Sequence, residues 1–247
     1  MIYREYLVMR NALAWFAGIV LVLMIIVPAA SRGDVGVEIN AIRYGEIANG
    51  AAWLTAIFAA IFGVALGNSS REAARVLWVL PAPRWKLALQ VVAVDLVGTT
   101  GAFACVYAFY LAVAALRLRL NVHGTPSAAD IAMGLAMVYG TYGWSALIGM
   151  LGRRIAYGGI IALPLLMIWM ILAQSQNPAA TILRAPLVAN PFAVYNAGLV
   201  AVSNAGLDAW PSLQWVGATW ATPILVAIAV ATCGLAVALW RRAEVIN

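Results

Sequence analysis

The sequence predicts an all-α integral membrane protein that crosses the bilayer with helices. Hydrophobic residues make up 65% of the 247 residues and charged residues only 10%, whereas a soluble domain carries about 25% charged residues. The mean hydropathy is +0.93. Apolar runs of roughly 20 residues recur along the chain, which is the length a helix needs to span the hydrocarbon core. Strands of a membrane barrel would instead appear as short segments of alternating hydrophobicity.

Six membrane spans can be read from these runs. We expect them at residues 13–30, 47–67, 87–116, 131–151, 155–173 and 218–240. The third run has 30 residues, more than the roughly 20 that a crossing needs. We therefore expect this helix to tilt, to bend near Gly98 or Gly101, or to protrude from the bilayer.

Two further segments flank or connect the spans. Residues 1–12 carry an apolar stripe of Ile2, Tyr6 and Met9, which predicts a helix lying in the cytoplasmic interface; the alternative is a plain extension of the first span. Residues 174–217 are long, apolar and interrupted by proline. Their apolar run at 192–207 is too short to cross the bilayer, so we expect an extracellular re-entrant or interfacial helix there.

The distribution of basic residues predicts the orientation. With the N-terminus inside, ten of the 15 Lys and Arg residues fall on the cytoplasmic side and five on the other. Basic residues concentrate on the cytoplasmic side of membrane proteins, so both termini are expected in the cytoplasm. The same rule explains the net charge of +6 without any nucleic-acid partner.

The polar interruption at residues 69–86 is the strongest lead to function. It reads SSREAARVLWVLPAPRWK and separates the second and third apolar runs. Ser69 and Glu72 have the spacing of a capping box, which predicts a helix beginning there, and Pro81 is expected to end it. A short basic helix between spans suits the docking of a soluble partner at the membrane surface. The alternative is a solvated loop that rests on the lipid headgroups.

The chain lacks the motifs of several chemistries. It contains no phosphate-binding loop of the Gly-x-x-x-x-Gly-Lys-Ser/Thr type, so we expect it neither to bind nor to hydrolyse ATP by itself. His123 is the only histidine, which argues against a multi-histidine metal site. No catalytic, cofactor-binding or metal-binding residue is therefore assigned.

Asp95 is the acidic residue placed well inside a predicted span. Such charges are costly and usually face a cavity or a partner. Asp95 either contacts a cationic substrate or couples transport to protons, or it pairs structurally with an arginine, a hydroxyl group or a neighbouring subunit. Four tyrosines of spans three and four line a pathway or pack the helices: Tyr107, Tyr110, Tyr139 and Tyr142.

The order of these features resembles the type-2 permeases of ATP-binding-cassette exporters, which are common in bacterial inner membranes. The local motif is Glu72 followed by Leu-x-x-Leu-Pro-x-x-Arg at residues 77–84, with Pro83 as a departure from the usual pattern. The resemblance implies a coupling helix that contacts a separate ATPase. The contacts it implies are Arg71, Glu72, Arg75, Leu77, Trp78, Leu80 and Arg84.

The same resemblance implies a transmembrane permease subunit that is not itself an enzyme. Its partners would be the ATPase subunit, which uses ATP and Mg²⁺, a second permease subunit in a homodimer or heterodimer, and membrane lipid. Two other functions compete with this one. A stand-alone carrier or channel is disfavoured by the absence of internal repeats, and an intramembrane enzyme would need polar catalytic groups clustered at one depth.

Overall fold

A computed structural model describes residues 7, 9–20, 22, 41–76, 84–116, 121–123, 127–151, 158–174, 180–203, 213 and 215–242. Residues 9–20 are helical. The elements that follow are β1 (Ala41–Arg43), α2 (Tyr44–Val76), α3 (Arg84–Leu116), β2 (Asn121–His123), α4 (Ala128–Leu151), α5 (Gly158–Gln174), α6 (Ala180–Arg184), the 3-10 helix η3 (Ala185–Ala189), α7 (Pro191–Ser203) and α8 (Gly217–Arg242).

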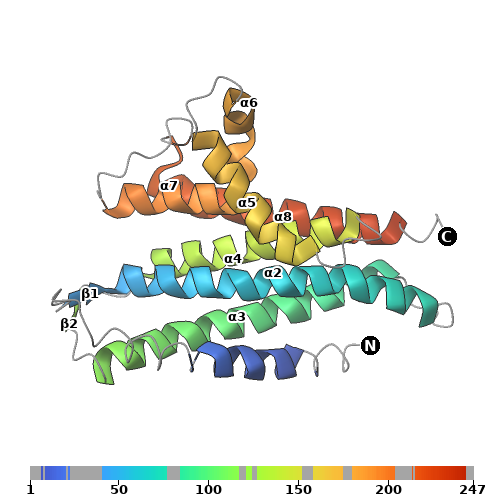
Figure 1. Ribbon diagram of the computed structural model, residues 1–247, viewed down its shortest axis with the longest axis horizontal. Helices are drawn as coiled ribbons and strands as arrows, with labels where there is room; N and C mark the ends of the chain where they lie inside the picture. The colour runs from blue at the N-terminus through green and yellow to red at the C-terminus, as the bar shows by residue number, and fades with distance from the viewer. Residues whose placement is uncertain are drawn as a thin grey trace.

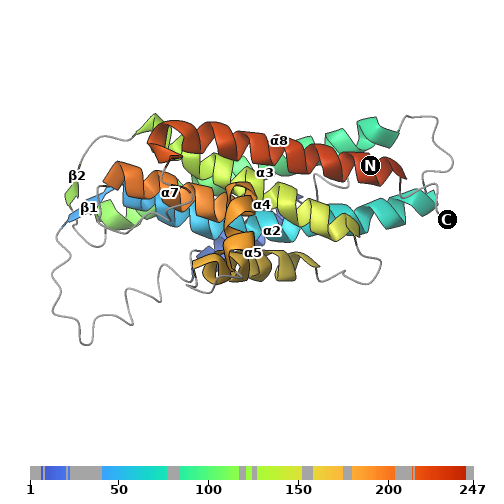
Figure 2. The same cartoon turned by 90° about the horizontal axis from the view of Figure 1, so that it is seen from above.

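The long helices form a bundle. Helices α2, α3, α4 and α8 lie lengthwise beside one another, while α5 crosses this direction steeply and carries α6 away from the bundle (Figure 1, Figure 2). Helix α4 is central, because its most extensive contacts are with α2 and α8. Helices α2 and α4 run in the same direction, since Gly45 faces Asp130 near their starts and Gly63 faces Tyr142 further along.

Four helices in the described part of the chain are long and apolar enough to cross a membrane. Their apolar stretches are Tyr44–Val64, Trp85–Ala112, Ala128–Met150 and Gly217–Trp240. These agree with the second, third, fourth and sixth expected spans. The fifth coincides with α5, whose apolar stretch Leu163–Ala173 is shorter, and residues 23–30 of the first lie outside the described residues. The protein is therefore a multi-pass membrane protein, and the count of six spans stays a prediction.

Helix α2 corrects one prediction. It continues without a break through Ser69 and Glu72 to Val76, so the expectation that a helix begins at Ser69 is wrong. The physical reason is that extending an existing helix is far easier than nucleating a new one. Serine in a helix interior costs only a fraction of a kcal/mol, roughly 0.5, and no proline precedes Pro81 in this segment.

Helix α3 contains the whole third apolar run, and whether it tilts, bends or protrudes from the bilayer stays a prediction. It is a single helix of 33 residues that passes through Gly98 and Gly101, which corresponds to about 50 Å. Helical glycine is tolerated here because Gly98 lies directly against the side chain of Met9. A larger side chain at position 98 would have to displace the Met9 side chain.

The N-terminal helix packs against the bundle. Met9 and Val20 are buried, and the Phe16 ring lies 4.7 Å from the Phe58 ring of α2. Residues 9–12 therefore share one helix with the beginning of the first expected span, as the plain-extension alternative predicts. Residues 1–6 lie outside the described residues, so an interfacial helix there stays a prediction.

The connection between α5 and α8 contains short helices rather than a loop. Helix α7 has 13 residues, about 20 Å, which is too short to cross about 30 Å of hydrocarbon. Asn190 caps it: the Asn190 side-chain oxygen accepts hydrogen bonds from the backbone N–H groups of Phe192 (3.0 Å) and Ala193 (3.4 Å). Asparagine at this position followed by proline is a favourable helix start.

The same junction is fixed to the neighbouring helices by side chains that donate to backbone carbonyl groups. The Asn190 amide donates to Leu166 of α5 at 2.9 Å. The Trp144 indole of α4 donates to Ala189 at 2.8 Å, and the Trp169 indole of α5 donates to Leu183 at 3.0 Å. Helices α4 and α5 therefore hold the start of α7 in place, and α5 also holds α6. Whether this junction enters the bilayer as a re-entrant segment stays a prediction.

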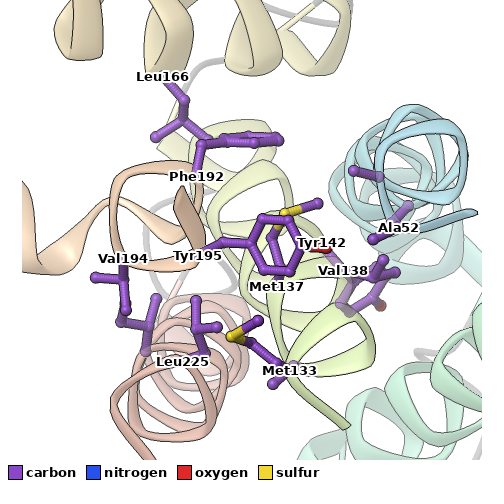
Figure 3. Close-up of a cluster of buried hydrophobic side chains, with 14 of the residues drawn as sticks. Ala52, Met133, Met137, Val138, Tyr142, Leu166, Phe192, Val194, Tyr195 and Leu225 are labelled. Carbon is purple, nitrogen blue, oxygen red and sulfur yellow. The ribbon is translucent and has the colours of Figure 1, made fainter. Parts of the chain in front are cut away.

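The apolar core lies where α4 meets α2, α7 and α8. Tyr195 of α7 points toward Met137 and Val138 of α4, with Ala52 of α2 beyond them (Figure 3). Leu225 of α8 belongs to the same cluster. Small residues on α2 allow this close packing of helices, as expected inside a membrane, where packing rather than hydrophobic exclusion drives association.

Candidate functional site: a buried polar cluster between α3 and α4

Asp95 of α3 is bonded to Tyr142 of α4. The Tyr142 hydroxyl donates to Asp95 Oδ2 at 2.8 Å, and the Asp95 side chain is only 4% exposed. A hydrogen bond to a carboxylate is stronger than one between neutral groups. A hydroxyl group is one of the structural partners that the sequence left open for Asp95, and whether Asp95 also has a functional role stays a prediction.

Two threonines extend the cluster along α3. Thr99 donates its hydroxyl to the backbone carbonyl of Asp95, and Thr100 donates to the carbonyl of Leu96 at 2.7 Å. The Thr100 and Tyr139 hydroxyl oxygens lie 2.5 Å apart. Because the single Thr100 hydroxyl hydrogen goes to Leu96, the Tyr139 hydroxyl donates to Thr100. Two tyrosines of α4, almost one turn apart, thus each hold a polar group of α3.

Helix α2 and the N-terminal helix cover the polar cluster. A Cβ atom on Gly63 of α2 would lie 2.5 Å from the carbonyl oxygen of Tyr142 and 2.8 Å from Ser145 Cβ, so α2 packs directly on this part of α4. On another side, Met9 covers Gly98, about one turn from Asp95. The carboxyl group is therefore surrounded by protein rather than by lipid.

This arrangement can link α3 to α4 and offers one ionisable group inside the bundle. Charged or polar groups at this depth are costly unless they are paired, so each partner of the cluster constrains the other. Among the described residues no group of three or more His, Cys, Asp or Glu side chains is placed to hold a metal ion. The chemistry present is that of hydrogen bonding.

The other pathway tyrosines lie elsewhere. Tyr107 and Tyr110 follow Asp95 by 12 and 15 residues on α3, about 18–22 Å along the helix. The Tyr107 ring stacks on Phe103 with 6.3 Å between centroids. A Cβ on Gly50 of α2 would lie 3.2 Å from the Tyr110 ring. The residues that the sequence predicted to line a pathway therefore form two groups. Tyr139 and Tyr142 lie with Asp95, whereas Tyr107 and Tyr110 lie further along α3.

The proposed coupling residues are only partly within the described chain. Arg71, Glu72 and Arg75 belong to the last two turns of α2, and Arg84 is the first residue of α3. Three more fall outside the described residues: Leu77, Trp78 and Leu80. The end of α2 and the beginning of α3, which flank residues 77–83, thus lie at the same end of the bundle (Figure 1).

Sequence reasoning missed Thr99, Thr100 and Asn190. The two threonines follow Asp95 by four and five positions, a spacing that places them on neighbouring parts of one helix face. Asn190 immediately before Pro191 has the composition of a helix start. No family model, curated protein or solved structure matches the chain.

Proposed function

We propose that the chain is the transmembrane permease subunit of an ATP-driven exporter of the ATP-binding-cassette kind. It would form half of a translocation pathway and receive work from a separate ATPase subunit. The observation that supports this most is the continuity of α2, which carries the apolar stretch Tyr44–Val64 and continues to Val76. Twelve residues, about 18 Å, extend beyond the apolar stretch.

The mechanism follows from this continuity. The extension contains Arg71, Glu72 and Arg75, the residues that the exporter resemblance assigns to the ATPase contact. Because a helix is stiff along its axis, movement of this end is transmitted to the membrane-embedded part of α2. Gly63 then passes the displacement to α4 at Tyr142, the residue that holds Asp95. Rigid-body movement of packed helices is a common way to switch a pathway.

Two copies, or this chain and a related permease, would enclose the pathway together. In the proposed orientation both termini and the residue 69–86 segment face the cytoplasm, in the plasma membrane of a bacterium. ATP and Mg²⁺ would bind to the partner ATPase and not to this chain.

The experiment is co-purification with a candidate ATPase encoded beside the permease. The double variant Arg75→Glu with Trp78→Ala is expected to lose most of the bound ATPase and its permease-dependent ATP hydrolysis, because charge and aromatic contact are removed together. The matched control is Trp220→Ala, an exposed tryptophan at the other end of the bundle. Full co-purification and full hydrolysis with the double variant would refute the coupling assignment.

A stand-alone carrier is the second candidate, and the buried Asp95–Tyr142 bond favours it. Carriers use intramembrane carboxyl groups to bind protons or cations. Asp95→Asn keeps the size of the side chain and removes its charge. Uptake or efflux that persists without any ATPase and is abolished by Asp95→Asn would favour the carrier over the exporter subunit.

A further inference from the structure

One face of α3 is exposed from the first turn of the helix onward, and further exposed positions follow at Ala104, Cys105, Ala108 and Ala112. We call the first part of this face the α3 stripe; it consists of Trp85, Lys86, Leu89, Gln90, Ala93 and Val97, all exposed. The opposite face is buried and includes Ala88, Val91, Val92 and Asp95. The helical period of this division shows that the stripe faces away from the bundle.

The stripe has a polar end and an apolar remainder. Trp85 and Lys86 lie at the start of the apolar stretch Trp85–Ala112, and the Lys86 ammonium is 5.7 Å from the centre of the Trp85 ring. The side chains further along are apolar apart from Gln90, with Leu89 47% and Val97 72% exposed. Tryptophan and lysine at the end of a span are typical of the membrane–water interface.

The α3 stripe is the part of the exposed face that lies within one leaflet of its polar end. Lys86 and Val97 are 11 residues apart, about 16 Å along a helix, and half of the hydrocarbon core is about 15 Å. A lipid whose headgroup lies at Lys86 therefore has its acyl chain beside Leu89, Ala93 and Val97.

The charge of the stripe selects the kind of lipid. Lys86 is the only lysine in the chain, and the described residues place no carboxylate against it. Arg84 precedes it by two positions, and Arg71 and Arg75 belong to the end of α2 that lies at the same end of the bundle. Basic groups beside a membrane attract anionic lipid headgroups.

We propose that the α3 stripe binds an anionic phospholipid of the leaflet at this end of the bundle. The phosphate pairs with the Lys86 ammonium, the Gln90 amide donates to the headgroup region, and one acyl chain lies along Leu89, Ala93 and Val97. The proposal concerns lipid recognition and does not depend on a partner ATPase.

The first test compares lipids retained by the purified full-length protein, measured by native mass spectrometry after reconstitution in an equimolar mixture of phosphatidylglycerol and phosphatidylcholine. The wild type is expected to retain more phosphatidylglycerol than phosphatidylcholine. Lys86→Gln is expected to lower the ratio of the two lipids about fivefold, the factor that one basic residue near the surface supplies. Arg10→Gln removes the same charge from an exposed position of the N-terminal helix and is expected to lower the ratio less than Lys86→Gln does.

The second test needs no variant. Because Lys86 is the only lysine, an amine-reactive reagent modifies only Lys86 and the N-terminal amine, and the latter reports the general effect of surface charge. Modification of Lys86 is expected to slow about fivefold in discs containing phosphatidylglycerol, relative to the N-terminal amine, for the same reason. Equal retention of both lipids by the wild type, an undiminished preference in Lys86→Gln, or equal slowing of both amines would each overturn the proposal.

Discussion

At the residue scale, the Asp95–Tyr142 hydrogen bond is the buried polar contact that joins α3 to α4. The two residues are 47 positions apart in sequence, so the bond joins α3 to α4 and not neighbouring turns of one helix. A carboxyl group without its donor inside a protein costs more than the bond itself contributes, because desolvation is then uncompensated. Removing either partner should therefore weaken the packing of α3 against α4.

Tyr142→Phe is expected to destabilise the folded protein by about 1–2 kcal/mol, since it removes the hydroxyl and keeps the ring. The measurement is reversible unfolding in mixed micelles. Asp95→Leu in the same background removes both acceptor oxygens and supplies a double-mutant cycle. Strictly additive effects of the two substitutions would show that the bond does not contribute to stability.

Asn190→Ala is expected to cost about 1 kcal/mol through loss of the α7 cap, and more if the Leu166 carbonyl also loses a needed donor. Asn190→Ser retains an acceptor for the N–H groups of Phe192 and Ala193, so it should recover part of the loss. Hydrogen exchange of those amides measures the effect locally. Unchanged protection of α7 in Asn190→Ala would contradict the capping role.

The sequence sufficed to single out Asp95 and to name a hydroxyl group among its alternatives. It did not identify Tyr142 as the partner, because the choice between Tyr139 and Tyr142 depends on the rotation of α4 relative to α3. The structure assigns Tyr139 to Thr100 and Tyr142 to Asp95. A rotation of α4 by one residue position, about 100°, would exchange such pairings, and apolar periodicity alone does not fix it when α4 is apolar nearly all round.

At the element scale, the contact between α2 and α4 depends on a residue without a side chain. Gly63 allows α2 to approach the α4 backbone at Tyr142 and Ser145. Close approach of this kind is how small residues hold membrane helices together. Any larger side chain must separate the helices locally.

Gly63→Ala is expected to destabilise the protein by about 1–3 kcal/mol by overpacking. Gly234→Ala is the matched control, because a Cβ there meets no atom within 4 Å. Alanine also favours the helix over glycine by about 1 kcal/mol, so the control should be neutral or slightly more stable. Thermal unfolding of both variants in one detergent measures the difference; equal midpoints would contradict the close α2–α4 contact.

The helical elements were predictable to different degrees. Four long apolar runs became long helices because their length and composition leave no other way to satisfy the backbone in lipid. The continuation of α2 through Ser69 was not predictable from the capping pattern, because the same residues also fit a helix interior. The steep direction of α5 is set by tertiary contacts, including the bond from Trp169 to Leu183 of α6 and the bond from Asn190 to Leu166 of α5.

At the scale of the whole molecule, the bundle separates two ends. The C-terminal ends of α2, α4 and α8 and the beginning of α3 lie at one end, and the strands lie at the other (Figure 1). The charge distribution of the sequence predicts that the first end faces the cytoplasm.

Cysteine labelling tests that assignment in a background with Cys105 and Cys233 replaced by serine. Ala128→Cys, an exposed position at the start of α4, is expected to react with a membrane-impermeant maleimide on intact cells. Trp85→Cys at the start of α3 is expected to react only after permeabilisation. The reverse result would overturn the orientation, and reaction of both from one side would contradict a membrane-crossing α3.

The short strands bear on how the bundle can open. β1 pairs in parallel with β2, with Ile42 opposite Val122, and each strand immediately or closely precedes a helix, α2 and α4 respectively. The pairing holds the beginnings of these two parallel helices together. Any separation of α2 from α4 is then smallest at the strands and largest at the opposite end. The two helices would therefore open by rotating about the end that carries the strands.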